Sequence, residues 1–193
     1  ARIVRLADAD ELSDLLADVN GAGEHAIPWG GGDHIHIGNT PAAYDVAIDL
    51  SRIVGIIEYE PADMTIVARG GEPISSLQAV LAKEGQRLTL DMPDSGNATV
   101  GGALAANAVT PIRSSAGGLR DVALGLTVVE ADGAITKSGG RVVKNVQGYD
   151  LVRLHTGALG TLGIIVEAAF KVAPIPATSR TVIGWVEDIE SAS

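Results

Sequence analysis

The first hydrophobic pattern along the chain is typical of an amphipathic helix. Its apolar residues recur at helical spacing, at Leu12, Leu15, Leu16 and Val19. Asp8 precedes them as a residue type that caps helices, Glu11 follows three positions later, and Gly21 lies where the pattern stops. We therefore predict a helix that begins after Asp8 and ends near Gly21.

Shorter apolar runs predict strands. Residues 24–29 (EHAIPW) and 45–53 (DVAIDLSRI) flank a glycine-rich loop, and residues 53–60 and 64–70 are joined by the turn PAD into a hairpin. The clearest hairpin is 122–139, where two strand patterns meet at an Asp-Gly turn. These runs predict a chain rich in antiparallel strands.

Further helices lie between and after these strands. One begins at Pro73 and ends at Gly85, and an alanine-rich stretch after residue 100 is predicted to be helical although it starts at a glycine pair. Residues 145–174 hold a short helix, a glycine-rich turn and a long strand that ends at its prolines, and residues 178–193 begin one more strand. No repeat is present, and the one boundary we draw lies near residues 58–63.

Composition narrows the class of protein. The chain has 193 residues, 46% of them hydrophobic, and a formal net charge of -10. It is long enough to bury a core and too acidic to attract nucleic acid. It has no cysteine, so disulfides, thiolate zinc sites, iron–sulfur clusters and cysteinyl cofactor links are excluded in this chain. No apolar run has the length of a membrane span, and the amino terminus is unlike a secretory signal.

Familiar catalytic motifs are missing. We find no GxxxxGK[ST] phosphate loop, no GxGxxG dinucleotide turn, no serine nucleophile elbow and no HExxH, which disfavours a standard hydrolase or kinase. His34 and His36 could share a metal if the segment is extended, but no further ligand is evident nearby, so they are predicted to be polar loop residues. We interpret His155 as a helix-end or interface residue in preference to a catalytic base.

The segment IPWGGGDHIHIGNT, residues 27–40, carries the most specific local signal. Clustered glycines indicate either several tight turns or several places where backbone approaches one object closely. Successive N–H groups in such a loop can bind an anion without any charged side chain. This second interpretation suits an acidic chain that has no lysine in the loop.

Five segments together carry a resemblance. IPWGGG, IDLSRIVGIIEYEPADMTIVARGG, TVGGALAANA, RDVALGLTVVEADG and GGRVVKNVQGYDLVRLHTGALGTLGIIVEAAFKVAP occur in the order seen in the vanillyl-alcohol oxidase-type FAD-binding domain, also called the PCMH type. Within that family they resemble most the FAD subunits of bacterial glycolate oxidase. The resemblance implies an α+β fold of two lobes. A small mixed α/β lobe (about 1–58) would precede a larger, mostly antiparallel sheet flanked by helices (about 59–176).

The same resemblance implies a set of residues that bind FAD. The first pyrophosphate loop would be Gly30, Gly31, Gly32, Asp33 and His34. The second wall would be Pro93, Asp94, Thr99, Gly101, Gly102 and Asn107, and its glycine pair opens a helix whose amino end also favours phosphate. The remaining matches are Gly118, Asp121, Gly163, Ile164 and Ile165. Asp33 stands where covalent members of the family carry a flavin-linking histidine, so we expect non-covalent FAD.

The resemblance also implies a function. We expect an FAD-binding subunit or fragment of a glycolate oxidase-like 2-hydroxy-acid oxidoreductase, in which flavin accepts hydride from the substrate α-carbon. No residue stands out as a catalytic base. Relatives continue into a cap that binds substrate, and residues 177–193 are expected to be the start of that region, truncated or absent here.

Two other functions stay open. The missing cap and Asp33 allow a non-catalytic assembly subunit that keeps the FAD fold, and the flavin subunit of a molybdenum hydroxylase is a weaker match.

The resemblance also implies partners, which are a second FAD subunit and an iron–sulfur subunit. The implied location is cytoplasmic, with peripheral attachment at the inner membrane face through partners.

Overall fold

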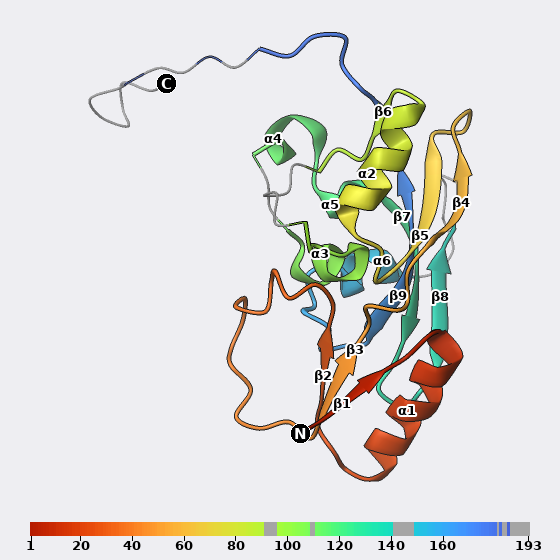
Figure 1. Ribbon diagram of the computed structural model, residues 1–193, viewed down its shortest axis with the longest axis vertical. Helices are drawn as coiled ribbons and strands as arrows, with labels where there is room; N and C mark the ends of the chain where they lie inside the picture. Colours follow the sequence, from red (N-terminus) through yellow and green to blue (C-terminus); the bar gives the residue numbers. More distant parts are fainter. Residues whose placement is uncertain (91–95, 109–110, 141–148, 181, 183–184, 186–193) are drawn as a thin grey trace.

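The computed structural model describes residues 1–90, 96–108, 111–140, 149–180, 182 and 185. The chain forms a small parallel sheet and a larger antiparallel sheet, with helices packed against both (Figure 1). The mixed α/β class with a mostly antiparallel sheet flanked by helices is therefore confirmed. Pro93 and Asp94, which the resemblance assigns to the cofactor site, lie outside the described residues.

The small sheet has three parallel strands in the order β1-β3-β2: β1 (Arg2–Arg5), β2 (Ala26–Trp29) and β3 (Val46–Asp49). The sequence analysis predicts β2 and β3 but not β1, because four residues that alternate charged and apolar side chains give little signal. The described parts of the small sheet end at Asp49, and β4 of the large sheet begins at Ile56. The division into two lobes at about residue 58 stays a prediction.

Helix α1 (Ala9–Gly21) joins β1 to β2 and forms as predicted. The Asp8 carboxylate accepts hydrogen bonds from the N–H groups of Asp10 at 3.0 Å and Glu11 at 2.9 Å. The Glu11 carboxylate in turn accepts from the N–H of Ala7 at 2.8 Å. These bonds satisfy donors that a helix start leaves without an intrahelical partner.

The buried face of α1 joins the two sheets. Its buried side chains pack in one apolar cluster with β3, with Ile53 after it, and with the nearer ends of β7 and β9. The members from these elements are Leu12, Leu16, Val19, Val46, Ile48, Val129, Ile164 and Val166. Burying such side chains is worth about 1.5–3 kcal/mol each. The small sheet is thus fixed against the large one through α1.

The large sheet has five antiparallel strands in the order β4-β5-β9-β7-β8: β4 (Ile56–Glu60), β5 (Thr65–Arg69), β9 (Ile164–Lys171), β7 (Ala123–Val129) and β8 (Ile135–Gly139). Both predicted hairpins are confirmed, as β4–β5 and β7–β8. The long strand predicted before the prolines is β9, and it lies at the centre of the sheet. Strand β9 therefore pairs with β5 on one side and with β7 on the other, which joins three distant parts of the sequence.

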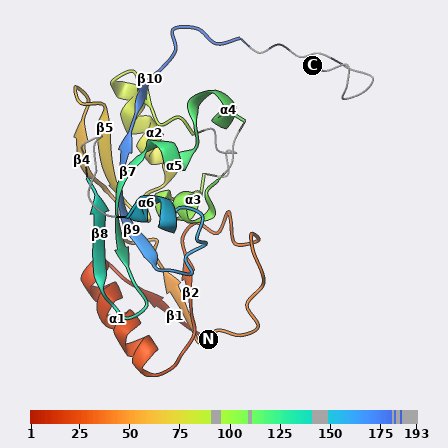
Figure 2. The same cartoon turned by 180° about the vertical axis from the view of Figure 1, so that it is seen from behind.

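Helices α2 (Ile74–Lys83), α3 (Val100–Ala106) and α5 (Leu119–Val122) lie on one side of this sheet, and α1 lies at the end nearest β1 (Figures 1 and 2). The main core between sheet and helices includes Ile66, Leu77, Leu104 and Phe170, each fully buried. The predicted helices after Pro73 and after residue 100 are confirmed as α2 and α3.

Smaller elements complete the fold. Helix α4 (Arg113–Ala116) precedes α5, and α6 (Leu151–His155) contacts β7 and β8. Strand β6 (Gln86–Arg87) pairs with β10 (Ala173–Pro174), a pairing that the sequence does not predict. The strand predicted within residues 178–193 lies mostly outside the described residues. None of the helices in the described ranges is long and apolar enough to cross a membrane.

The cap of α1 gives a testable prediction. Asp8→Ala removes a side chain that accepts two backbone N–H groups, so it should cost about 1 kcal/mol of unfolding free energy and roughly 2–4 °C in Tm. Thermal unfolding followed by circular dichroism measures the change. Asp14→Ala is the matched control, because Asp14 is exposed in the same helix. Equal losses in both variants would contradict the role given to the cap.

Candidate functional site

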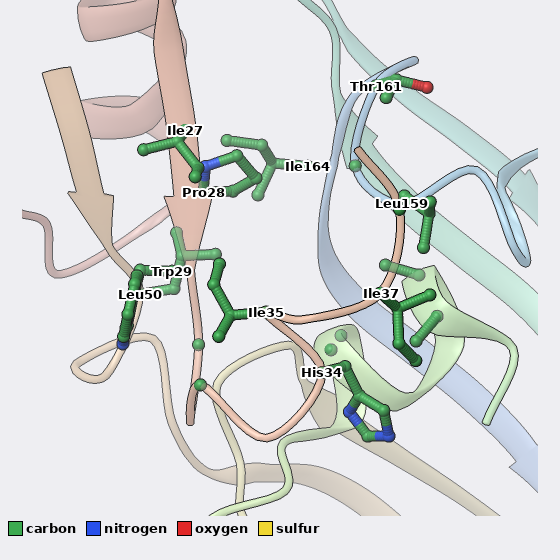
Figure 3. A pocket seen from close by; sticks show the side chains of 18 of the residues that line it. Ile27, Pro28, Trp29, His34, Ile35, Ile37, Leu50, Leu159, Thr161 and Ile164 are labelled. Carbon is green, nitrogen blue, oxygen red and sulfur yellow. The ribbon is translucent and has the colours of Figure 1, made fainter. Parts of the chain in front are cut away.

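A cavity of about 670 Å³ opens between the small sheet, α3 and the segment that leads into β9. Its size lies within the usual range for small-molecule and cofactor sites. The loop between β2 and β3, residues 30–45, forms one wall, and we call it the rim loop (Figure 3). Segments from distant parts of the sequence form the others: 98–102, 105–106 and 159–165, with Leu50 and Gly70.

The glycine triplet begins the rim loop directly after β2. Gly32 has φ +83°, in the left-handed region, and the loop then makes turns in which Ile35 donates to the Gly32 carbonyl and Ile37 to the His34 carbonyl. Within the described part of the chain, no hydrogen bond uses the N–H of Gly31, Gly32 or His34 as donor. Such a set of neighbouring N–H groups with a left-handed residue among them is suited to bind an anion.

Gly31 has a second role that the sequence does not show. A Cβ added to it would lie 1.6 Å from the carbonyl oxygen of Asn97, so the backbone of the rim loop touches the backbone that precedes α3. A Cβ on Gly30 would lie 2.6 Å from Thr99 Oγ1. The first two glycines therefore allow close contact within the chain, and that contact closes one corner of the cavity.

The amino end of α3 is engaged by its own neighbours. Val100 donates to the Glu72 carbonyl at 2.9 Å and Gly101 to the Gly70 carbonyl at 2.7 Å. The N–H of Gly102 meets the hydroxyl of the capping residue Thr99 at 3.2 Å. These three donors already have partners, so Gly101 and Gly102 line the cavity without offering it a free N–H group.

The turn before β9, residues 157–163, forms the opposite wall. The Gly157 N–H donates to the Leu104 carbonyl, and the Leu159 N–H donates to the Ala105 carbonyl. Both carbonyls lie in the last turn of α3. Gly163 lines the cavity with Ile164 and Ile165, whose side chains are buried in the two cores. The turn thus caps the carboxyl end of α3 and at the same time shapes the cavity.

The structure brings most of the predicted site residues together. Those that line the cavity are Gly30, Gly31, Gly32, Asp33, His34, Thr99, Gly101, Gly102, Gly163, Ile164 and Ile165. Asn107, Gly118 and Asp121 do not line it. Asn107 ends α3 in a left-handed conformation, and the Asp121 carboxylate accepts the Gly118 N–H at 2.8 Å to cap α5.

The electrostatics of the cavity are unusual for an anion site. Among its described lining residues, Asp33 is the one charged side chain at neutral pH, with no lysine or arginine. His25 also lines it, and its N–H donates to the Asp45 carboxylate at 2.8 Å, which lowers the pKa of Asp45. An anion here would be held by backbone N–H groups.

Two histidine predictions concern other chemistry. No group of three or more histidine, cysteine or acidic side chains that could hold a metal ion occurs among the described residues. His155 is the last residue of α6, which agrees with its prediction as a helix-end residue. Its side chain is buried and does not line the cavity. Burial lowers the pKa of its imidazole.

Sequence reasoning missed the apolar walls. The side chains that surround the cavity include Ile27, Pro28, Trp29, Ile35, Ile37, Leu50 and Leu159 (Figure 3). Ile35 and Ile37 alternate with His34 and His36, a pattern that could have indicated one apolar side to this loop. Trp29 lies against Gly32, since a Cβ there would be 3.2 Å from the indole ring.

Comparisons with known proteins agree on the fold and the cofactor. Residues 1–139 match the family described as FAD binding domain. The chain is 35% identical over 178 residues to glycolate oxidase subunit GlcE of Escherichia coli, covering 90% of this chain and 50% of that protein. It is 30% identical over 194 residues to subunit GlcD of Bacillus subtilis, covering 99% and 41%.

A solved structure of alkyldihydroxyacetonephosphate synthase is also similar, with a TM-score of 0.75 and 28% identity over 91% of this chain and 32% of that one. The chain thus spans half or less of the length of each of these three proteins.

The contact at Gly31 gives a prediction. Gly31→Ala places a methyl group inside contact distance of the Asn97 backbone, which has no flexible side chain to yield, so it should cost about 2 kcal/mol or more of unfolding free energy. Urea unfolding measures the change. The control is Gly21→Ala, where a Cβ meets nothing within 4 Å and the helix should be as stable or slightly more stable. A Gly31 variant as stable as the control would contradict the contact.

Proposed function

The chain belongs to the FAD-binding domain family, and on that premise we propose that it is the FAD-binding part of a flavin-dependent 2-hydroxy-acid oxidoreductase. FAD is its cofactor. The two glycolate oxidase subunits to which it is similar support the substrate class, because glycolate is the simplest 2-hydroxy acid. The observation that carries the proposal is the cavity itself. It is lined by apolar side chains and by the backbone of Gly31, Gly32 and His34, whose N–H groups donate no hydrogen bond within the described part of the chain.

The residues present fit the parts of FAD. The N–H groups of Gly31, Gly32 and His34 would hold the diphosphate, which requires donors but no positive side chain. Flat aromatic rings would lie against the apolar walls that Ile27, Ile35 and Leu159 help to form. The close contact of Gly31 with Asn97 would hold both walls at the spacing that the cofactor needs.

When bound, FAD supplies the acceptor for the hydride that leaves the α-carbon of a 2-hydroxy acid. This chain binds and orients the cofactor and excludes water from the part that it encloses. Among the described residues that line the cavity, we assign none as a general base. We propose that the groups that bind substrate and remove its hydroxyl proton belong to a further domain or a partner chain, and that FAD is held without a covalent bond.

The partners follow as part of the same proposal. Both relatives are named as subunits, and the chain spans half or less of each of them. We propose assembly with a second FAD-binding subunit and an iron–sulfur subunit that accepts the electrons. A cytoplasmic location with attachment to the inner membrane face through these partners belongs to the same proposal.

A second function is favoured by one observation. Because the described cavity lining offers Asp33 as its one charged side chain and no evident base, the chain could serve as a non-catalytic assembly subunit. Glycolate and D-lactate oxidation, assayed with an artificial electron acceptor for the chain alone and for the chain with its partners, separates the two functions. Turnover that requires the FAD of this chain supports the enzyme.

Reconstitution tests the proposed function directly. The purified chain mixed with FAD and passed through a desalting column should retain about one FAD per chain, with the visible absorption bands of a flavin, and should release it on acid denaturation. Release shows that the link is not covalent. A chain that is folded by circular dichroism but emerges without flavin would overturn the proposal.

Asp33 gives a sharper prediction. A carboxylate in the same loop as the diphosphate donors repels the cofactor, so Asp33→Asn should bind FAD roughly fivefold more tightly at low salt, with a smaller gain at high salt. Isothermal titration calorimetry gives the dissociation constants. Asp63→Asn makes the same charge change at an exposed residue outside the cavity lining and should leave the affinity unchanged. Equal gains in both variants would mean that net charge alone acts.

A further inference from the structure

Leu159 has a backbone conformation that its residue type rarely adopts. Its φ is +54°, in the left-handed region, where a side chain other than that of glycine, asparagine or aspartate is disfavoured. The other residues of the 157–163 turn with positive φ are glycines: Gly157, Gly160 and Gly163. Backbone strain of this kind concentrates at functional sites, so the leucine side chain is a candidate for a role there.

The backbone of Leu159 is held in place by α3. Its N–H donates to the Ala105 carbonyl at 2.8 Å, and Gly157 donates to the Leu104 carbonyl at 3.0 Å. The Thr161 hydroxyl donates to the Ala158 carbonyl at 2.7 Å, which closes the turn on its other side. The direction of the Leu159 side chain is therefore set by bonds to a helix that itself lines the cavity.

That side chain reaches across to the rim loop. Leu159 Cδ1 lies 3.0 Å from the position that a Cβ on Gly38 would take, and Gly38 has φ +93°. Next to it, Pro28 Cγ lies 3.0 Å from the corresponding position of Gly160. Figure 3 shows Leu159 and Ile37 on these two segments at the same side of the cavity. The positive φ of Gly38 favours glycine there, and a Cβ at this position would press on the leucine side chain.

The rim loop is held by hydrogen bonds near its two ends and meets Leu159 at Gly38, halfway along it. At the base, His25 and Asp45 exchange hydrogen bonds, each 2.8 Å long, and Leu50 donates to the Trp29 carbonyl at 2.9 Å. Halfway along the loop, Gly38 meets Leu159, and both residues line the cavity. Leu159 is still 41% exposed, so the contact lies at the mouth and not in the core.

Resting on the proposed function, we propose that Leu159 is a positioning residue of the FAD site, which holds the rim loop closed over bound cofactor through Gly38. FAD can leave only when this contact opens. Loss of the side chain should therefore speed FAD release, while the N–H groups that bind the diphosphate stay in place. The effect acts on the rate of release, because the contact lies between two walls and not on the anion donors.

The experiment compares four variants. Leu159→Gly removes the contact and relieves the left-handed strain, Leu159→Ala removes the contact and keeps the strain, and Leu159→Met keeps an apolar side chain of similar reach. Leu162→Ala is the matched control, since Leu162 is exposed to a similar degree on the same turn but does not line the cavity. Protein loaded with radiolabelled FAD is chased with excess unlabelled FAD and sampled by rapid filtration.

We expect roughly tenfold faster release from Leu159→Gly and Leu159→Ala, and release close to that of the unmodified chain from Leu159→Met and Leu162→Ala. The Tm of Leu159→Gly should be no lower than that of Leu159→Ala, so faster release is not a result of lost stability. Release rates equal to the control in both Leu159→Gly and Leu159→Ala would overturn the inference, as would an equal acceleration in Leu162→Ala.

A measurement without FAD separates this inference from the proposed function. The Ile37 N–H is hydrogen-bonded to the His34 carbonyl at 3.0 Å, so its hydrogen exchange reports opening of the rim loop. Exchange at Ile37 should be several-fold faster in Leu159→Gly and Leu159→Ala than in Leu162→Ala. Unchanged exchange overturns the role of Leu159. If the unmodified chain binds no FAD, the proposed function fails, and this measurement still decides whether Leu159 holds the loop.

Discussion

The close approach of backbone to backbone around the cavity is the constraint on which the rest of the structure depends. Gly31 lies against the Asn97 carbonyl, and Gly70 and Gly101 lie against the carbonyl of Ile165 in β9. At these three places a side chain as small as a methyl group would enter another segment. The loop after β2, the start of α3 and the central strand of the large sheet can meet only because these residues are glycines.

This arrangement explains how an acidic chain can bind a cofactor that carries a diphosphate. The chain has a net charge of -10, and the described residues that line the cavity include no lysine or arginine. We propose that backbone N–H groups take the role of such a side chain at Gly31, Gly32 and His34, because the donors at the start of α3 are already bonded to Glu72, Gly70 and Thr99. Gly31 belongs both to this proposed anion site and to the contact between the walls.

Features set by neighbouring residues were predictable from the sequence. The cap at Asp8 and the turn at Gly133, where φ is +87°, depend on a few adjacent residues, and α1 and the β7–β8 hairpin form as expected. The pairing of β6 with β10 was not predictable, because each partner is two residues long and the two are far apart in sequence. Most of the candidate site came from a resemblance, which also carried over Asn107, Gly118 and Asp121, residues that cap helices here. The contact of Gly31 with Asn97 and the strained Leu159 exist only in the folded chain.

The most direct test follows the backbone amides of the ¹⁵N-labelled chain by NMR as FAD is added, with riboflavin, which has no phosphate, as the comparison. The account predicts large shifts of the Gly31, Gly32 and His34 amide signals with FAD and much smaller ones with riboflavin. Amide signals of Gly101 and Gly102 that shift strongly with FAD, while those of the glycine triplet stay in place, would contradict it.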